Sequence, residues 1–202
     1  MGKWTRRGFI SAGVLGGGAL LIGVSLRMGN RVQELSPLVA GEGEQLLNPF
    51  VKIDVDNRVT AVIPHSEMGQ GAHTALAQML ADEMDADWDD VSFEEAPAAD
   101  EYANWALVKG YALGEAQVPA VLMGTADGLF MQVANAMHMQ VTGGSLSIRS
   151  TGLAGMRVGG AAAREMLIAA AAAAWGVPAA EISTERGTLQ HRASGKQAAF
   201  QQ

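Results

Sequence analysis

The sequence contains no cysteine, and this absence excludes several kinds of site at once. Without thiols the chain cannot form a disulfide, a thiolate zinc site or a cysteine-ligated iron–sulfur cluster of its own. Aromatic residues are also scarce, at 5%, whereas glycine and alanine are plentiful, so helices can pack closely. Because acidic residues exceed basic ones, giving a formal net charge of −7, the composition argues against nucleic acid as a partner.

The length and apolar content suit one domain together with a targeting segment. Nearly half of the 202 residues are hydrophobic, which is enough for a core. Lys3, Arg6 and Arg7 precede an apolar run over residues 9–26 that five glycines dilute. The stretch Thr5-Arg6-Arg7-Gly8-Phe9-Ile10 looks like a twin-arginine export signal, which a receptor reads as an address. We therefore predict a signal over residues 1–30 and export to the periplasm by the twin-arginine route.

The sequence is compatible with either cleavage of this signal or its retention as a membrane anchor. The apolar run is about 18 residues long, which is roughly the span of a bilayer, although its glycines make it a weak membrane helix. The cleavage candidate Leu38-Val39-Ala40 is a poor small-x-small site. An uncleaved signal acting as an inner-membrane anchor is therefore the alternative to a cleaved one. Residues 31–48 are polar, with glycine and proline, and are interpreted as a linker to a domain over residues 49–202.

Strand and helix patterns alternate along this domain. Period-2 alternation predicts strands, and apolar residues at helical spacing predict helices. The expected elements are strands at 51–55, 59–63 and 91–94, helices at 72–85 and 159–175, and a last hairpin at 182–185 and 188–191. Residues 103–140 are expected to be an elaborated loop with some helix between 129 and 139. The order predicts an α+β fold, a ferredoxin-like split βαβ sheet with helices on one face, preceded by the signal or anchor helix.

A glycine-rich turn between a predicted strand and a predicted helix is the most informative motif. It reads Glu67-Met68-Gly69-Gln70-Gly71-Ala72-His73-Thr74. Two glycines let the backbone approach a ligand closely, and the N–H groups of the following helix would point at that ligand. The Gln70 amide can both donate and accept a hydrogen bond. The turn is neither a GxGxxG fingerprint nor a P-loop, but it suits a phosphate or a polar heterocycle.

A second glycine-rich turn precedes the alanine-rich helix. Thr142, Ser145 and Ser147 supply hydroxyl groups, while Gly143 and Gly144 supply N–H groups that can form a nest for a phosphate oxygen. If the helices expected at 72–85 and 159–175 lie side by side on the sheet, their N-termini lie at the same edge of the sheet. The two turns would then bind an anion from two sides. The alternative is that both turns are ordinary helix caps, because serine, threonine and glycine favour such positions anyway.

The ordered motifs resemble a known family. The chain resembles the N-terminal part of the molybdopterin-binding beta subunit of isoquinoline 1-oxidoreductase, in the xanthine oxidase and aldehyde oxidoreductase family of molybdenum hydroxylases. The resemblance rests on the twin-arginine start and the motifs Ser66-Glu67-Met68-Gly69-Gln70-Gly71, Leu80-Ala81-Asp82-Glu83, Ala86-Asp87-Trp88, Glu95-Ala96-Pro97, residues 142–149 and residues 160–167. It covers most of the chain.

The resemblance implies a cofactor and an activity. Gly69, Gln70 and Gly71 would contact a molybdopterin dinucleotide, in its cytosine form, near the molybdenum. Thr142, Gly143, Gly144, Ser145 and Ser147 would bind its phosphate. The metal would be held by the pterin dithiolene, so no protein metal ligand is expected. The implied reaction is the hydroxylation of an N-heteroaromatic or an aldehyde with water as the oxygen source, by a molybdenum-dependent oxidoreductase. Electrons would pass to iron–sulfur clusters on a separate small [2Fe-2S] subunit.

The chain also departs from the family pattern. The family subunit is several times longer, and its catalytic glutamate lies near its C-terminus, beyond anything that matches this sequence. Catalytic residues therefore cannot be assigned, and we expect this chain alone to be catalytically incomplete, with the remainder of the large subunit as a partner. The alternative is a truncated, non-catalytic exported interaction module.

Three polar residues near the first turn invite other interpretations. Glu67 could be mistaken for a catalytic base, but a surface or capping role is expected. His65 and His73 flank the turn without a carboxylate at metal-ligand spacing, so a metal site is not expected there.

Overall fold

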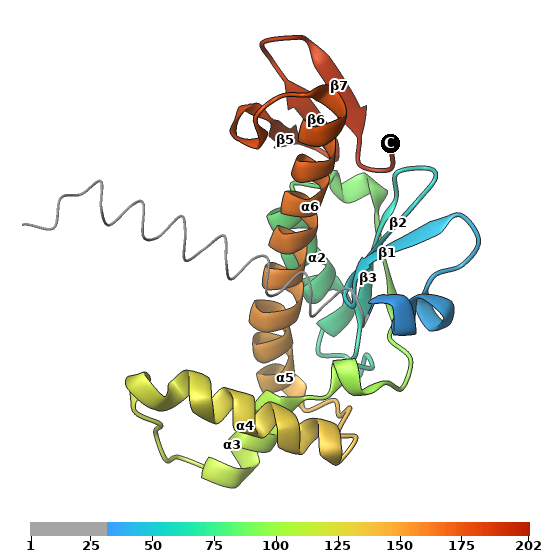
Figure 1. Cartoon of the computed structure of the whole chain (residues 1–202). Helices are drawn as coiled ribbons and strands as arrows, with labels where there is room; N and C mark the ends of the chain where they lie inside the picture. Colours follow the sequence, from blue (N-terminus) through green and yellow to red (C-terminus); the bar gives the residue numbers. More distant parts are fainter. Residues whose placement is uncertain (1–31) are drawn as a thin grey trace, which may run out of the picture.

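The computed structural model describes residues 32–202, apart from the side chains of residues 146 and 147. The predicted signal over residues 1–30 lies outside the described residues. The main sheet has four strands in the order β1 (Glu44–Asn48), β2 (Val51–Asp54), β3 (Val59–Ile63) and β4 (Val91–Glu95) (Figure 1). β1–β2 and β2–β3 are antiparallel, whereas β3–β4 is parallel. The prediction of mixed helix and sheet is confirmed, and the sheet itself is mixed.

The predicted hairpin at 51–63 is confirmed as β2 and β3. Its turn is held by Asp54, whose Oδ1 accepts hydrogen bonds from the backbone N–H groups of Asp56 and Arg58, both at 2.9 Å. Asn57 takes a positive φ of 66°, a conformation that asparagine tolerates better than most residues. Every residue of β3 is buried, so helices or loops cover both faces of the sheet at this strand.

One face of the sheet packs against α2 (Ala72–Met84) and α6 (Val158–Trp175), which lie side by side. Two features let α6 approach closely. The side-chain amide of Asn48 donates a 2.9 Å hydrogen bond to the carbonyl of Gly159. A Cβ added at Gly160 would lie only 3.0 Å from the Leu80 carbonyl oxygen, so this contact requires glycine. α5 (Gly144–Thr151), a π-helical stretch at Gly152–Arg157 and α6 follow one another directly in the chain. Together they form one long helical segment, which we call the α5–α6 rod.

The other face of the sheet is not bare, contrary to the expectation of helices on one face alone. A helix over residues 32–39 covers part of it, and Leu35 and Val39 pack with Leu46, Val62 and Tyr102 in a second cluster (Figure 1). Within the segment interpreted as a linker, residues 44–48 also form β1. These elements were missed because each is short, and because the polar residues, glycines and prolines of residues 31–48 favoured a linker.

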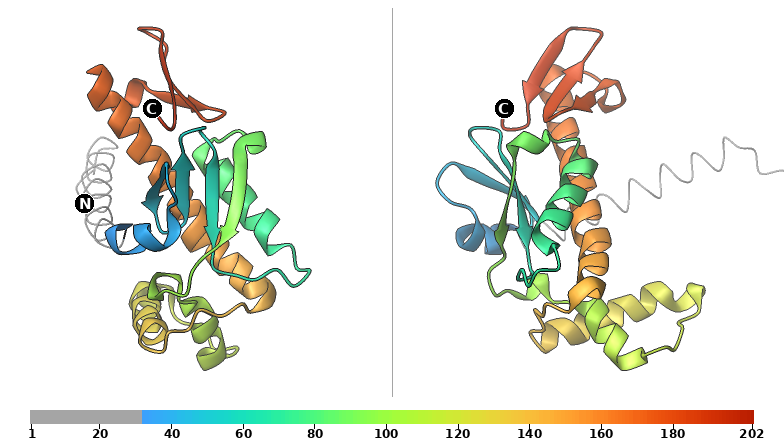
Figure 2. Two further views of the ribbon diagram at one scale, coloured as in Figure 1. Left: turned by 90° about the vertical axis from the view of Figure 1, so that its right-hand side faces the viewer. Right: turned by 180° about the vertical axis from the view of Figure 1, so that it is seen from behind.

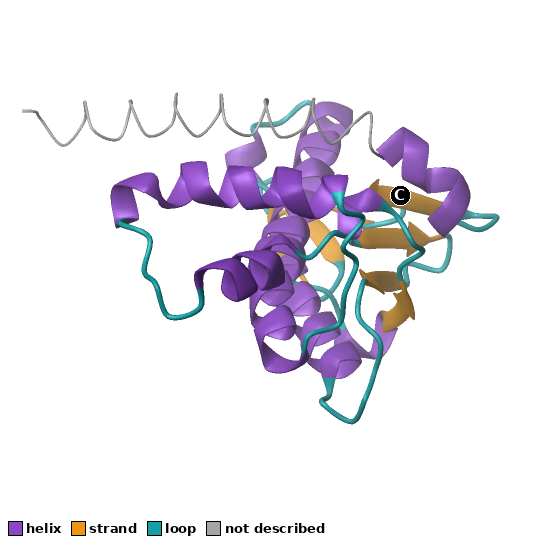
Figure 3. Ribbon diagram, turned by 90° about the horizontal axis from the view of Figure 1, so that it is seen from below, coloured by secondary structure: helices purple, strands orange, loops and turns teal. Residues whose placement is uncertain are grey.

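The region expected to be an elaborated loop is mostly helical. α3 (Trp105–Leu113) and α4 (Met123–Ala136) form a helical pair at the lower end of the view in Figure 1, the end from which Figure 3 is seen. An ion pair of 2.6 Å between Lys109 Nζ and Asp127 Oδ1 joins the two helices. The Asn104 side chain caps α3 by accepting a hydrogen bond from the Leu107 N–H. Short 3₁₀ helices lie at Trp88–Asp90, Asp100–Tyr102, Ala120–Leu122 and Ala179–Glu181.

The C-terminal strands do not join the main sheet, which overturns the ferredoxin-like split βαβ prediction. β5 (Ser183–Glu185), β6 (Thr188–His191) and β7 (Lys196–Ala199) form their own antiparallel sheet at the far end of α6 (Figure 2). Ile182, Leu189 and Phe200 insert into the main core, and the Gly187 N–H donates to the Asp85 carbonyl at 2.8 Å. Apolar contacts, this backbone hydrogen bond, a 2.6 Å ion pair between Arg186 and Asp87 and hydrogen bonds of the Asn57 side chain attach the second sheet. No strand of one sheet pairs with a strand of the other within residues 32–202.

None of the helices between residues 32 and 202 combines the length and the apolar character needed to cross a bilayer.

Candidate functional site

The first glycine turn is an exposed loop between β3 and α2. Gly69 and Gly71 have φ angles of +88° and +72°, in the left-handed region that favours glycine. A Cβ added at either glycine would meet nothing within 4 Å, so backbone conformation, and not crowding, requires these two residues. The turn thus presents bare backbone to solvent at the N-terminus of α2.

A carboxylate of the turn itself occupies this N-terminus. Glu67 Oε1 accepts hydrogen bonds from the N–H groups of Gly69 at 2.8 Å and Gly71 at 2.9 Å, and its Oε2 accepts one from the His73 N–H at 3.3 Å. These bonds, that from Gly71 first, lower the pKa of Glu67 below its ordinary value. The capping role expected for Glu67 is confirmed. The N–H groups of Gly69 and Gly71 thus converge on one carboxylate oxygen within the turn.

Gln70 closes the same turn. Its side-chain oxygen accepts from the Met68 N–H, and its amide nitrogen donates to the Ser66 carbonyl at 2.7 Å. Both ends of the amide are therefore engaged within the loop. Each of these hydrogen bonds is exposed to water, so exchanging them for ligand contacts costs little free energy.

The second turn begins beside the first. The Ser66 N–H donates a 3.0 Å hydrogen bond to Thr142 Oγ1, joining two segments 76 residues apart in sequence. Gly143 precedes α5, Gly144 has a φ of +61° with open space around it, and Ser145 is exposed. Ser147 lies within α5, but its side chain is outside the described ones. The second turn therefore begins the helix α5, whereas the sequence predicted a helix only from residue 159.

Further contacts join the same two segments. His65, which is 3% exposed, shares a 2.8 Å hydrogen bond between its Nε2 and Thr151 Oγ1 of α5. His73 Nε2 lies 2.9 Å from the His65 carbonyl oxygen, and the His73 ring lies against Phe93, with centroids 4.8 Å apart. His65 and Thr151 were missed as partners, since their separation of 86 residues carries no local signal.

Histidine and carboxylate groups do not converge on a metal site in the part of the chain that the structure describes. Within residues 32–202, no group of three or more such side chains is placed to hold an ion. His73 Nε2 and Glu95 Oε1 are 3.6 Å apart, and Glu95 is largely exposed. The chemistry that this edge offers is therefore hydrogen bonding, through backbone N–H groups, hydroxyls and one side-chain amide.

Comparisons with known proteins agree with the motifs. Residues 18–107 match the family model of a molybdopterin cofactor-binding domain, which includes the first turn and ends before the second. The chain is 31% identical over 199 residues to isoquinoline 1-oxidoreductase subunit beta of Brevundimonas diminuta. It is 36% identical over 87 residues to the membrane-bound aldehyde dehydrogenase (pyrroloquinoline-quinone) of Gluconacetobacter polyoxogenes.

The coverage of these relatives is unequal. The first alignment includes 98% of this chain but 21% of the relative, and the second includes 43% of this chain and 11% of the relative. The chain thus spans about a fifth of the length of the first relative. The resemblance that the motifs predicted is confirmed: over nearly its whole length this chain is similar to the beta subunit of isoquinoline 1-oxidoreductase, and over residues 18–107 to a molybdopterin cofactor-binding domain.

Proposed function

We propose that this chain is the N-terminal portion of a molybdenum hydroxylase large subunit and that its two glycine turns bind a molybdopterin dinucleotide. The observation that carries the proposal is the hydrogen bond from the Ser66 N–H to Thr142 Oγ1, which brings both turns to one edge. A ligand with a polar heterocycle at one end and phosphates along its length needs donors on two neighbouring segments.

The residues present fit such a group. At the first turn, Gly69 and Gly71 already direct their N–H groups at a single anionic oxygen, that of Glu67. A phosphate or a pterin oxygen that displaced this carboxylate would find the same donors and the positive end of the α2 dipole. At the second turn, the open space beside Gly144 and the exposed hydroxyl of Ser145 would accommodate a phosphate. Gly143, Thr142 and Ser147 complete the proposed set.

In this proposal, the residues of this chain would bind the cofactor and orient it. When bound, the cofactor would supply the molybdenum-centred chemistry that hydroxylates an N-heteroaromatic or an aldehyde with oxygen from water. Gln70, released from Met68 and Ser66, would donate and accept at the heterocycle, while the backbone of Gly69 and Gly71 would allow close approach. We assign no catalytic residue within the 202 residues.

We propose two protein partners and a cellular location for this chain. The remainder of the large subunit would complete the site, and a small [2Fe-2S] subunit would receive the electrons. We propose the cytosine form of the dinucleotide and export by the twin-arginine route, to the periplasm or the periplasmic face of the inner membrane. Support comes from the similarity to the beta subunit and from the motif at residues 5–10.

A second candidate function is a non-catalytic exported interaction module. The observation that favours it is that the donors of the first turn are satisfied internally by Glu67 and Gln70. The two candidates differ in whether a pterin is retained.

The deciding experiment is to express the chain together with its downstream coding region and to assay the purified material for molybdenum and pterin dinucleotide. Stoichiometric recovery that falls in a Ser145→Ala, Gly144→Ala double variant would support cofactor binding at the second turn. The exposed pair Ser183→Ala and Gly195→Ala, in which the glycine also has a positive φ and open space around it, is the matched control and should leave recovery unchanged. Absence of pterin and molybdenum in the unaltered complex would favour the interaction module.

A further inference from the structure

α4 is a helix that lies almost entirely at the surface of the molecule. Of its 14 residues only Ala134 is buried, and Asp127 is its one charged residue. Surface helices of soluble proteins turn an apolar side to the core and a charged side to water, whereas a helix that is apolar on all sides is normally covered. α4 therefore exposes a surface that another element is expected to cover.

One side of α4 is already covered within this chain. Asp127 forms its ion pair with Lys109 of α3, and Ala134 has no exposed surface. A pocket of about 290 Å³ also lies on this side, lined by Met131 and Asn135 of α4 and, from other elements, by residues that include Phe50, Tyr102 and Trp105. Contacts within the chain thus account for this side of the helix.

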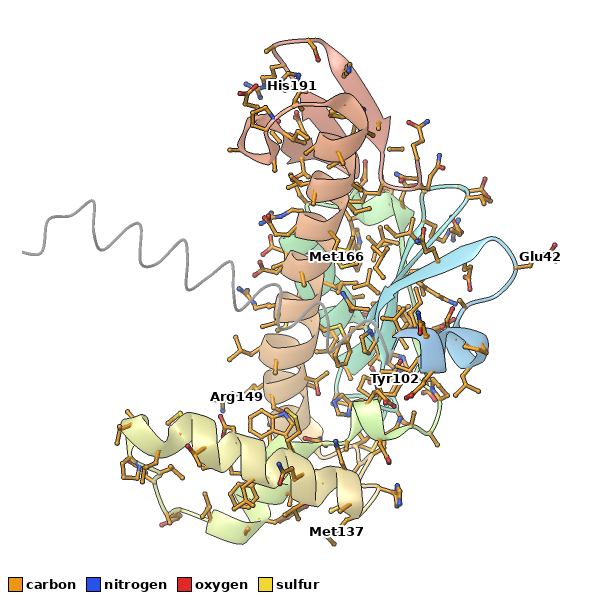
Figure 4. All side chains as sticks on the ribbon, viewed as in Figure 1. Glu42, Tyr102, Met137, Arg149, Met166 and His191 are labelled. Atoms are coloured by element: carbon orange, nitrogen blue, oxygen red, sulfur yellow. The ribbon has the colours of Figure 1, made fainter. Side chains whose placement is uncertain are left out.

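The opposite side of α4 carries an exposed apolar stripe. Residues three or four positions apart share one side of a helix, and here they are Leu122, Ala126, Leu129, Val133 and Met137, which we call the α4 stripe. Leu122, Leu129 and Met137 are 53%, 58% and 61% exposed. Figure 4 shows Met137 and His191 of the second sheet at opposite ends of the molecule. The stripe runs along the helix for roughly 22 Å, which is the spacing and length along which a second helix packs.

The absence of charge narrows the choice of partner. Between Lys109 and Arg149 the sequence has no lysine or arginine, whereas helices that lie on membrane surfaces carry such cations on their polar side. A second copy of the chain is also disfavoured, because each side of a stable interface contributes about 20–30 residues and the stripe offers far fewer. The stripe therefore fits an uncharged apolar element of a larger partner that also covers neighbouring surface.

The length of a relative points to that partner. This chain aligns with 21% of subunit beta of isoquinoline 1-oxidoreductase, so about four-fifths of that relative has no counterpart here. We propose that the α4 stripe is the docking surface for an uncharged apolar helix of the remainder of the large subunit. The docking surface rests on the proposed function for the existence of this remainder, and it does not require a bound cofactor.

The chain contains no cysteine, so a single introduced thiol reports on one position. Leu129→Cys lies in the stripe, and Leu38→Cys, at a similarly exposed leucine of the helix over residues 32–39, is its matched control. Maleimide labelling of each variant is compared between the chain alone and the chain expressed together with its downstream coding region, with the labelled peptide identified by mass spectrometry. We expect labelling at position 129 to slow at least tenfold in the joint product and labelling at position 38 to be unchanged.

Leu129→Glu tests whether apolar contact holds the partner. In the joint product we expect this substitution to expose Val133→Cys on the same stripe and to raise its labelling at least tenfold, because the new carboxylate would be buried without a partner. Leu38→Glu should leave position 133 protected. Both glutamate variants should keep the circular dichroism of the unaltered chain, since each replaces an exposed side chain.

Equal labelling at position 129 in the two preparations, or no association of the downstream product with this chain, would overturn the docking surface. Protection of position 129 in the chain alone would also overturn it: by phosphatidylcholine vesicles, the stripe would belong to a bilayer, and by a higher protein concentration, to a second copy. Protection in a joint product without molybdenum or pterin would support the docking surface and refute the proposed cofactor binding. Pterin in a joint product with position 129 unprotected would do the reverse.

Discussion

The Ser66 N–H and Thr142 Oγ1 lie 3.0 Å apart and connect the two glycine turns of this protein. Each turn follows a different part of the chain, and each opens a helix, α2 or α5. The contact brings exposed donors from both turns to one edge of the fold. Its loss should therefore affect a ligand held between the turns more than it affects the fold.

Thr142→Val tests this contact. The variant keeps the shape of the side chain but removes the acceptor of the Ser66 N–H, which is exposed and can turn to water. We expect a loss of no more than about 1 kcal/mol in the free energy of unfolding, measured by urea denaturation, together with a clear fall in pterin recovered from the complex. Thr142→Ser retains the hydroxyl and should behave as the unaltered chain. Equal pterin retention in Thr142→Val would contradict the two-turn cradle.

Glu67 makes the first turn sensitive to pH. Its folded-state pKa lies below the ordinary value of 4.5, so its contribution is fully present above that value. The contribution is lost as the pH falls through the lowered pKa, because a protonated carboxyl accepts weakly from Gly69 and Gly71. We expect the amide NMR signals of these two glycines to shift together below pH 4.5. In Glu67→Gln this titration should disappear, whereas Glu42→Gln, an exposed substitution elsewhere on the surface, should leave the response of the two glycines in place.

The same carboxylate competes with an external anion for the nest. Replacing Glu67 with alanine frees the N–H groups of Gly69 and Gly71 and removes a negative charge from the helix N-terminus. We expect inorganic phosphate to shift the amide signals of the two glycines at lower concentration in Glu67→Ala than in the unaltered chain. Glu42→Ala, elsewhere on the surface, controls for net charge. The same phosphate response in both variants would argue against a nest.

Lys52 attaches the helix over residues 32–39 to the sheet. Its buried ammonium donates to the Val39 carbonyl at 3.0 Å and to Glu44 and Glu94, both at 2.7 Å. Burial acts to lower the pKa of Lys52, but the two carboxylates outweigh it and the net shift is upward. The stabilisation is therefore present at neutral pH and is lost only as the pH rises through this raised pKa, above 10.5.

Lys52→Met should destabilise the chain by about 1–3 kcal/mol, because a buried carbonyl and two carboxylates lose their donor. Glu44 and Glu94 keep partial access to water, which limits the cost. Chemical denaturation measures the effect. Glu94→Gln leaves the other two bonds in place and should cost less. A loss as large as that of Lys52→Met would show that Glu94, and not the three-way arrangement, carries the contact.

A pair of glycine substitutions separates close packing from helix propensity. Gly160→Ala places a Cβ 3.0 Å from the Leu80 carbonyl oxygen and forces α2 and α6 apart, so we expect a loss of about 1–3 kcal/mol. Gly128→Ala, on the exposed side of α4, meets nothing within 4 Å and should stabilise by about 0.4–1 kcal/mol. Thermal unfolding of both variants provides the measurement. A stabilising Gly160→Ala would contradict the tight crossing.

Local sequence patterns were sufficient to predict those strands and helices that their own residues define. Alternation predicted β2, β3 and β4, and helical spacing predicted α2 within one residue of its observed ends. The segment between residues 103 and 140 was predicted only in part, since some helix was expected between 129 and 139, where α4 ends, but α3 and the first half of α4 were not. Glycines and methionines interrupt the periodicity of this segment, and α3 and α4 are stabilised by packing on one another. Ferredoxin-like pairing of the last hairpin was wrong, because sequence alone does not specify which sheet edge a short strand joins.

The sequence by itself determined the two glycine turns, the capping role of Glu67 and the family resemblance, since each depends on residue types at short spacing. Only the tertiary structure decided that Ser66 meets Thr142, that His65 meets Thr151, and that Phe50, Tyr102 and Trp105 enclose a pocket. These contacts join residues that are far apart in the chain. Burial and helix packing, rather than any local preference, set their distances.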